Sequence, residues 1–187
     1  MRVISGKYKG ANIISPHGEV RPTADMVKGS LFSILESKGA VKGARFLDLF
    51  CGSGAIGIEA LSRGAASCVF VDMNTANVIA NLDKLKIESR KLIRGDFRRA
   101  LRLLRNDKFD VIFCDPPYKS GYAQVALDTL LRYGMTDGGG TIIIEHNSSN
   151  DLINVPKDCI IDRRVFGITA LEIITRGDNE SNIRGDV

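Results

Sequence analysis

Between residues 44 and 147 the chain alternates short apolar runs with segments whose apolar residues recur at helical spacing. The short runs carry few polar residues, which indicates strands buried on both faces. Strands that alternate with helices predict a parallel sheet covered on both sides. The expected strands are residues 46–50, 68–72, 91–94, 109–114 and 140–147, and the expected helices are residues 55–64, 75–86, 98–106 and 122–134.

Both ends of the chain depart from this alternation. Residues 1–20 hold two short β-branched runs around glycines and predict a small N-terminal β-rich arm, and residues 21–35 predict a helix with Thr23 as its N-cap. Residues 159–176 read as two strands joined near Gly167, an antiparallel hairpin that closes the sheet. The fold class is therefore α/β, a Rossmann-like and mainly parallel seven-stranded sheet in one domain, residues 21–176. The polar tail, residues 177–187, is expected to be disordered.

Length, charge and cysteine content narrow the class of protein. A chain of 187 residues suits a single domain with its own core. The net charge is +4, and residues 1–28 carry five basic residues against two acidic ones. That asymmetry suits a polyanionic partner, although a solvated arm that binds nothing fits it equally well. The four cysteines form no C-x-x-C pair and predict reduced thiols, and the absence of a long apolar run predicts a cytoplasmic protein without a membrane span.

A glycine-rich segment follows the first expected strand. Gly52, Gly54 and Gly57 form G-x-G-x-x-G between a strand and a helix, and Asp72 ends the next strand. This pattern predicts a ligand at the carboxyl end of the sheet, with Asp72 on ribose hydroxyls. A tight turn without a ligand is the alternative. Asp48 would repel the pyrophosphate of a dinucleotide but suits an amine-bearing ligand such as the methionine part of S-adenosylmethionine; otherwise it orients the loop.

The third expected strand is followed by a further candidate pair. Asp96 could accept a hydrogen bond from an adenine amino group while Phe97 packs on the adenine ring. Alternatively, Asp96 is the N-cap of the helix that follows.

The fourth expected strand ends on Asp115-Pro116-Pro117-Tyr118. The prolines end the strand, fix the direction of the Pro116 carbonyl, and place these residues at the same sheet edge as the glycine loop. The Asp115 carboxylate and the Pro116 carbonyl offer two acceptors for an exocyclic amino group, and Tyr118 offers a flat face for its base. Two such bonds would favour a pyramidal nitrogen aimed at a sulfonium methyl. A structural Pro-Pro turn with an incidental acid is the alternative.

These motifs carry a resemblance to a known family. DLFCGSG, the acid Asp72, GDF and DPPY, in this order, are similar to class I S-adenosylmethionine-dependent amino-methyltransferases. The segments MRVISGKYKGANI, RPTADMVKGSLFSIL, DLFCGSGAIGIEALSRGA and VFGITALEII resemble the bacterial RsmD family, which methylates the 2-amino group of a guanine in 16S ribosomal RNA. The resemblance extends to about residue 176. Met26 and Gly29 stand where that family usually has Arg and Glu.

The resemblance implies a monomeric, metal-independent enzyme that uses S-adenosylmethionine, releases S-adenosylhomocysteine, and acts on 16S rRNA, free or within an assembling small subunit. A DNA adenine amino-methyltransferase and a non-enzymatic nucleotide- or RNA-binding module of the same fold are the alternatives. The implied catalytic residues are Asp115, Pro116, Pro117 and Tyr118. The implied cofactor contacts are Asp48, Phe50, Gly52, Gly54, Asp72, Met73, Asp96, Phe97 and Asp115. The implied RNA contacts are Arg2, Lys7, Lys9, Arg21, Thr23 and Lys28.

Overall fold

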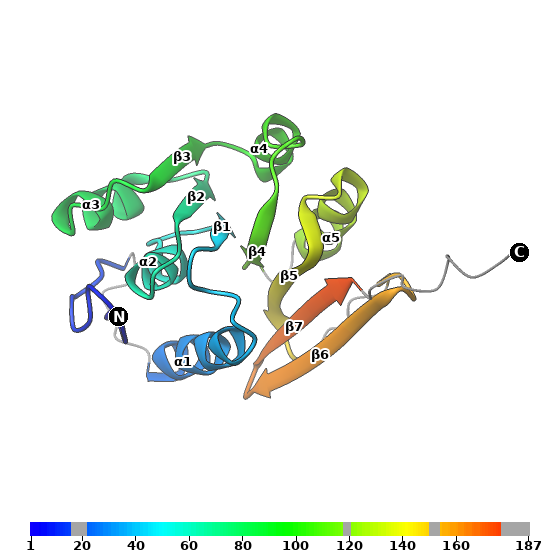
Figure 1. Ribbon diagram of the computed structural model, residues 1–187, viewed down its shortest axis with the longest axis horizontal. Coiled ribbons are helices and arrows are strands. Elements are labelled where there is room, and N and C mark those ends of the chain that lie inside the picture. Colours follow the sequence, from blue (N-terminus) through cyan, green and yellow to red (C-terminus); the bar gives the residue numbers. More distant parts are fainter. Residues whose placement is uncertain (16–21, 118–120, 150–153, 177–187) are drawn as a thin grey trace, which may run out of the picture.

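The computed structural model describes residues 1–15, 22–117, 121–149 and 154–176, and is built on one seven-stranded sheet (Figure 1). The strand order is β3-β2-β1-β4-β5-β7-β6. The strands are β1 (Arg45–Leu49), β2 (Ser67–Asp72), β3 (Arg90–Arg94), β4 (Phe109–Cys114), β5 (Thr136–Asn147), β6 (Cys159–Phe166) and β7 (Thr169–Arg176). The first five strands pair in parallel, and β7 is antiparallel to both β5 and β6. The predicted fold class is confirmed, including the C-terminal hairpin.

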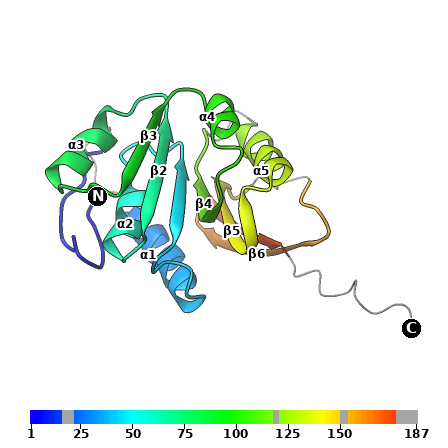
Figure 2. The ribbon, with the colours of Figure 1, turned by 45° about the horizontal axis from the view of Figure 1, so that its top comes forward.

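In the described part of the chain, five helices cover the two faces of the sheet (Figures 1 and 2). They are α1 (Pro22–Ser37), α2 (Ala55–Ser62), α3 (Ala76–Lys84), α4 (Phe97–Leu103) and α5 (Tyr122–Tyr133). Helices α1, α2 and α3 share one buried apolar cluster, and α4 and α5 share the other. Successive strand residues alternate between the clusters, as Phe46 and Leu47 of β1 do. Burial on both faces explains why these strands are apolar throughout.

The N-terminal segment, residues 1–15, differs from the expected β-rich arm. One isolated bridge, between Arg2 and Asn12, takes the place of two short strands. Val3 and Ile13 are buried in the cluster beneath α1 and α2, so the segment packs as part of the domain. Backbone hydrogen bonds join Val3 N to Ala11 O and Ile13 N to Met1 O, both at 2.9 Å, and side chains of the domain bind other backbone groups of the segment.

Several buried polar residues hold this segment, and Glu59 and Asn81 bind the backbone at two points along it. Glu59 of α2 accepts hydrogen bonds from the backbone N–H groups of Ile4, at 2.8 Å, and Ser5, at 3.0 Å. Asn81 of α3 accepts from Ile14 N at 2.8 Å and donates to Ile14 O at 3.0 Å. Asn81 also donates to Ser53 O at 2.9 Å. The N-terminal segment and the glycine loop therefore share one anchoring side chain.

Glu59 also pairs with two cations. Its carboxylate lies 3.3 Å from Lys28 Nζ and 2.8 Å from Arg63 Nε. The side chain of Lys28 is 2% exposed and donates to Arg2 O at 2.6 Å. Burial lowers the pKa of Lys28, and the neighbouring Glu59 carboxylate opposes that shift. We therefore correct the predicted RNA contact at Lys28 to a structural role, because its charge is used inside the protein.

Replacing Glu59 with alanine should destabilise the domain and release residues 1–15. The change leaves Lys28 without its buried carboxylate and two backbone N–H groups without acceptors, so the free energy of unfolding should fall by about 3–5 kcal/mol. Urea denaturation measures that loss, and hydrogen exchange at Ile4 and Ser5 reports the release.

Glu36→Ala is the matched control. Glu36 also pairs with Arg63, at 2.9 Å, but its side chain is 48% exposed. Its removal should lower the free energy of unfolding by less than about 1 kcal/mol. Equal losses in the two variants would contradict the anchoring role of Glu59.

Candidate active site

The glycines of the loop between β1 and α2 serve two purposes, close packing of α2 and an open backbone for a ligand. Gly52 and Gly54 have positive φ angles of 53° and 76°, and Gly54 is the N-cap of α2. A Cβ atom at Gly54 would lie 2.5 Å from Val78 Cγ2, and one at Gly57 would lie 2.3 Å from a ring carbon of Phe70. Gly54 and Gly57 therefore allow α2 to pack closely against the sheet and α3. No atom lies within 4 Å of the Cβ position of Gly52, so the backbone there is open to a ligand.

Asp72, at the end of β2, holds the turn of this loop. One carboxylate oxygen accepts from Gly52 N at 2.8 Å, and the other accepts from Asn74 N at 2.8 Å. A carboxylate offers about four lone-pair sites, so both oxygens retain capacity for the predicted ribose hydroxyls. Met73, the next residue, is 66% exposed and lies on the surface.

Asp48 of β1 lies beneath the loop. It is 2% exposed, and one carboxylate oxygen accepts from Gly57 N at 3.0 Å. Burial raises the pKa of Asp48 to about 7; the Gly57 N–H opposes this shift, and Asp115 and Asp72 add to it. The loop-orienting role is therefore present in the structure. Asp48 also lines a cavity at this edge of the sheet, as a ligand-facing acid must.

Asp96 and Phe97 occupy the neighbouring part of the edge. Asp96 caps α4, because its carboxylate accepts from Arg98 N at 2.8 Å. Phe97 is 3% exposed, and its ring centroid lies 4.9 Å from that of Phe50 and 5.2 Å from that of Tyr122. Phe97 thus packs against the rings of both Phe50 and Tyr122. Phe50 is the member of this cluster that lines the cavity, so we transfer the expected stacking on a ligand ring from Phe97 to Phe50.

The Asp-Pro-Pro segment lies beside the glycine loop, as the sequence predicts. Leu49 and Cys114, the last residues of β1 and β4, are paired in register, and Asp115 N donates to Leu49 O at 3.3 Å. Pro116 is buried and Pro117 is exposed. Burial raises the pKa of Asp115 to about 7. Tyr118 lies outside the described residues.

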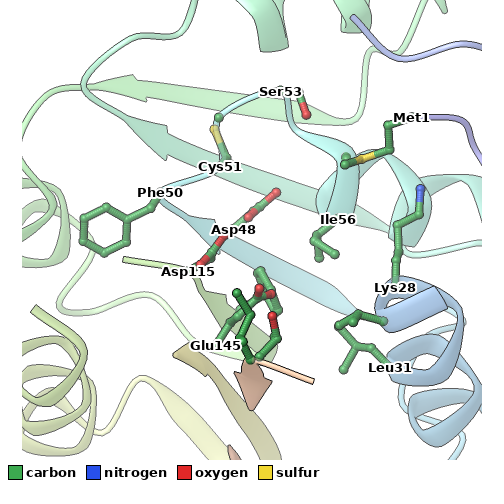
Figure 3. A pocket seen from close by; sticks show the side chains of 16 residues that line it. Met1, Lys28, Leu31, Asp48, Phe50, Cys51, Ser53, Ile56, Asp115 and Glu145 are labelled. Carbon is green, nitrogen blue, oxygen red and sulfur yellow. The ribbon is translucent and has the colours of Figure 1, made fainter. Parts of the chain in front are cut away.

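The loop and the Asp-Pro-Pro segment meet in a cavity of about 440 Å³ (Figure 3). Its walls come from β1, β4, β5, α1, α2, the N-terminal segment and the β6–β7 hairpin, and include Met1, Lys28, Leu31, Ile56 and Ile168. Asp48, Asp115 and Glu145 line the same cavity from three neighbouring strands. The sequence-based predictions did not include Glu145. Its signal was an acid at the end of an apolar parallel strand, the same signal that drew attention to Asp48.

The predicted RNA contacts are divided among several places. Arg2, Lys7 and Lys9 are exposed on the N-terminal segment, whose first residue, Met1, lines the cavity. Arg21 lies outside the described residues, as do the side chain of Thr23 and the tail, residues 177–187.

Within the described part of the chain, no group of three or more His, Cys, Asp or Glu residues is placed to hold a metal ion. None of the helices described there is long and apolar enough to cross a membrane.

The strand order and the glycine loop after β1 are those of a class I methyltransferase, and solved structures agree. The structure titled "Putative methyltransferase yhhF from Escherichia coli" is 30% identical, with a TM-score of 0.82 over 95% of this chain and 98% of that chain. A Thermus protein described as hypothetical is 26% identical, with a TM-score of 0.80 over 94% of this chain and 99% of that chain.

Sequence comparisons give the family. Residues 1–175 match the family described as "Conserved hypothetical protein 95". The Bacillus subtilis protein named "Putative rRNA methyltransferase YlbH" is 38% identical over 92% of this chain and 97% of its own length. "Ribosomal RNA small subunit methyltransferase D" of Escherichia coli K12 is 30% identical over 94% of this chain and 90% of its own length. The chain therefore belongs to this family, the RsmD family of methyltransferases.

Two glycine-to-alanine changes should separate packing from helix propensity. Gly57→Ala places a methyl group against Phe70 and Cys68, and should lower the free energy of unfolding by about 1–3 kcal/mol. Gly29→Ala, in α1, meets no atom nearer than 3.8 Å and should raise it by about 0.5–1 kcal/mol. Urea denaturation of both variants provides the comparison. A stabilising Gly57→Ala would contradict the close approach of α2 to β2.

Proposed function

We propose that the protein transfers a methyl group from S-adenosylmethionine to the exocyclic 2-amino group of a guanine in 16S ribosomal RNA. The observation that carries this proposal is the shared cavity, which Asp115 lines together with the open backbone of Gly52. The names of the relatives support RNA of the small ribosomal subunit as the substrate.

The cavity and its surroundings suit the cofactor. We assign its methionine part to the backbone at Gly52 and Gly54 with Asp48 nearby, its ribose to Asp72, and its adenine to the edge beside Phe50 and Asp96. The cofactor, when bound, supplies a methyl group on a positively charged sulfonium. A cation in a cavity lined by three carboxylates stabilises their ionised forms, so the raised pKa values of Asp48 and Asp115 should fall on binding.

Asp115 and the Pro116 carbonyl position the target nitrogen. An aromatic amine is a weak nucleophile because its lone pair is delocalised into the ring. Hydrogen bonds from its two protons to these acceptors favour a pyramidal nitrogen and orient its lone pair. Asp115 then accepts, or passes to water, the proton that the nitrogen loses. Tyr118 is proposed to stack against the base.

The target base must leave its stack to enter this cavity. A base within RNA is recognised in single-stranded or splayed form, at a cost of a few kcal/mol in unstacking. We propose that Arg2, Lys7 and Lys9 contact phosphates beside the cavity and offset part of that cost. Their exposure on the segment that begins at Met1 supports this placement.

A labelled-methyl transfer assay tests the proposed function. Purified protein and labelled S-adenosylmethionine are incubated with 16S RNA, with assembled small subunits and with DNA, and the labelled nucleoside is identified by mass spectrometry. We expect N2-methylguanosine in 16S RNA. Label in DNA as N6-methyladenine would favour an adenine methyltransferase. The absence of transfer to any acceptor would favour a non-enzymatic binding module.

Asp115→Ala should abolish most of the transfer while leaving the cofactor bound. Losing one acceptor on the amino group should lower kcat by about 100-fold or more, because that contact acts chiefly in the transition state. Calorimetry should show S-adenosylmethionine binding within a few fold of wild type.

The control is Asp110→Ala on the same strand. Asp110 is exposed, accepts from Arg45 N at 2.7 Å, and does not line the cavity. Its kcat should stay near the wild-type value. If Asp115→Ala retained activity equal to that of this control, the proposed role of Asp115 would be wrong.

A further inference from the structure

We propose that Glu145 selects guanine over other amino-bearing bases, by accepting a hydrogen bond from the ring N1–H while Asp115 accepts from the neighbouring 2-amino group. This proposal rests on the proposed function and deepens it. The Asp-Pro-Pro-Tyr segment alone recognises an amino group and does not distinguish the purines. A second acceptor, placed beside the first, would do so.

The sheet brings the two carboxylates together. Strands β4 and β5 are parallel, and Cys114 pairs with Ile144, so the next residues lie side by side, Asp115 just after β4 and Glu145 within β5. Phe113 and Ile143 belong to the same buried cluster, on the α1 and α2 face. Side chains two positions apart share a face, so Asp115 and Glu145 point to that side as well. Both line the cavity, as Figure 3 shows.

Both carboxylates lack partners within the described part of the chain. The side chains of Asp115 and Glu145 accept no hydrogen bond and form no ion pair with any described residue. Glu172 on the adjacent strand β7 is different, since it lies 3.0 Å from His146 Nε2 and 3.4 Å from Arg163 Nε. A carboxylate that lines a cavity and takes no donor from the described chain has its oxygens available to a ligand, which supports this proposal.

The pKa values agree with this environment. Burial raises the pKa of Glu145 to about 8, and the nearby Asp115 adds to the shift. Among the described residues, two other charged side chains line the cavity, Asp48 on β1 and Lys28 on α1. Asp48 accepts from Gly57 N, and Lys28 is paired with Glu59. Neither neutralises the Asp115–Glu145 pair.

The chemistry of the bases makes two adjacent acceptors selective. Guanine carries a donor N1–H next to its donor 2-amino group. Adenine carries a lone pair at N1 next to its 6-amino group, and cytosine carries one at N3 next to its 4-amino group. A carboxylate that faces such a lone pair is repelled and left without its hydrogen bond, and sites that depend on such a bond reject analogues strongly. When both are ionised, Asp115 and Glu145 therefore match guanine alone among these bases.

The test uses 2-aminopurine, which keeps the 2-amino group and has a lone pair at N1. Once the methylated position is mapped, RNA substrates carrying guanine or 2-aminopurine at that position are compared by kcat/KM. Wild-type protein should prefer guanine by about 100-fold or more. Glu145→Gln should reduce this preference to about tenfold or less, because an amide can accept from N1–H or donate to the N1 lone pair.

The matched control is Glu172→Gln, which removes a buried carboxylate from the neighbouring strand without touching the cavity. It should keep the wild-type preference. An unchanged preference in Glu145→Gln, or equal use of guanine and 2-aminopurine by the wild type, would overturn the selective role of Glu145. Neither result would contradict the proposed methyl transfer. If the wild type methylated no RNA at all, the proposed function would fail and this proposal with it.

A pH profile separates selection from a structural role. The proposal requires both carboxylates to be ionised, so kcat/KM should fall at low pH as the pair takes up its first proton. That proton binds chiefly to Glu145, whose pKa is raised further than that of Asp115. In Glu145→Gln the acid limb should move to lower pH, because only Asp115 then has to ionise. An acid limb that stayed at the wild-type pH would contradict the proposal.

Discussion

The central constraint in this protein is the gathering of three carboxylates in one cavity at one edge of one sheet. Asp48, Asp115 and Glu145 come from β1, β4 and β5, which are adjacent in the sheet, and all three line one cavity. Burial raises each of their pKa values to about 7 or 8, and their mutual repulsion adds to the shifts of Asp48 and Glu145. Such an arrangement destabilises the empty domain and favours ligands that bring cationic or hydrogen-bond-donating groups. A sulfonium cofactor and a guanine edge are ligands of that kind.

The rest of the structure maintains this cavity. Glu59 holds Lys28 and the N-terminal segment against α2, and Asn81 joins that segment to the glycine loop through Ser53. The aromatic cluster of Phe50, Phe97 and Tyr122 supports the loop from the other face of the sheet. Phe50 has a positive φ of 59°, an uncommon conformation for a residue other than glycine, and it lines the cavity. The wall therefore includes a backbone position that its neighbours must stabilise.

Local patterns predicted much of this arrangement, and long-range contacts account for the remainder. The alternation of apolar strands and helices predicted the sheet, and the rule that parallel strands end at one edge placed Asp115 beside the glycine loop from the sequence alone. Glu145 was missed because its closeness to Asp115 depends on the register of β4 against β5, which no local pattern reveals. Lys28 was misassigned because a charge count treats every lysine as exposed. The N-terminal arm forms one bridge because side chains on α2 and α3 bind its backbone.

The most direct test of the central claim is the number of protons released when S-adenosylmethionine binds at pH 7, measured by calorimetry in buffers of different ionisation enthalpy. A sulfonium placed among these carboxylates lowers their pKa values, so binding should release protons. S-adenosylhomocysteine has an uncharged sulfur and should release fewer. Binding of both ligands with no difference in proton release, or no binding of either, would contradict the assignment of this carboxylate-lined cavity to the methyl donor.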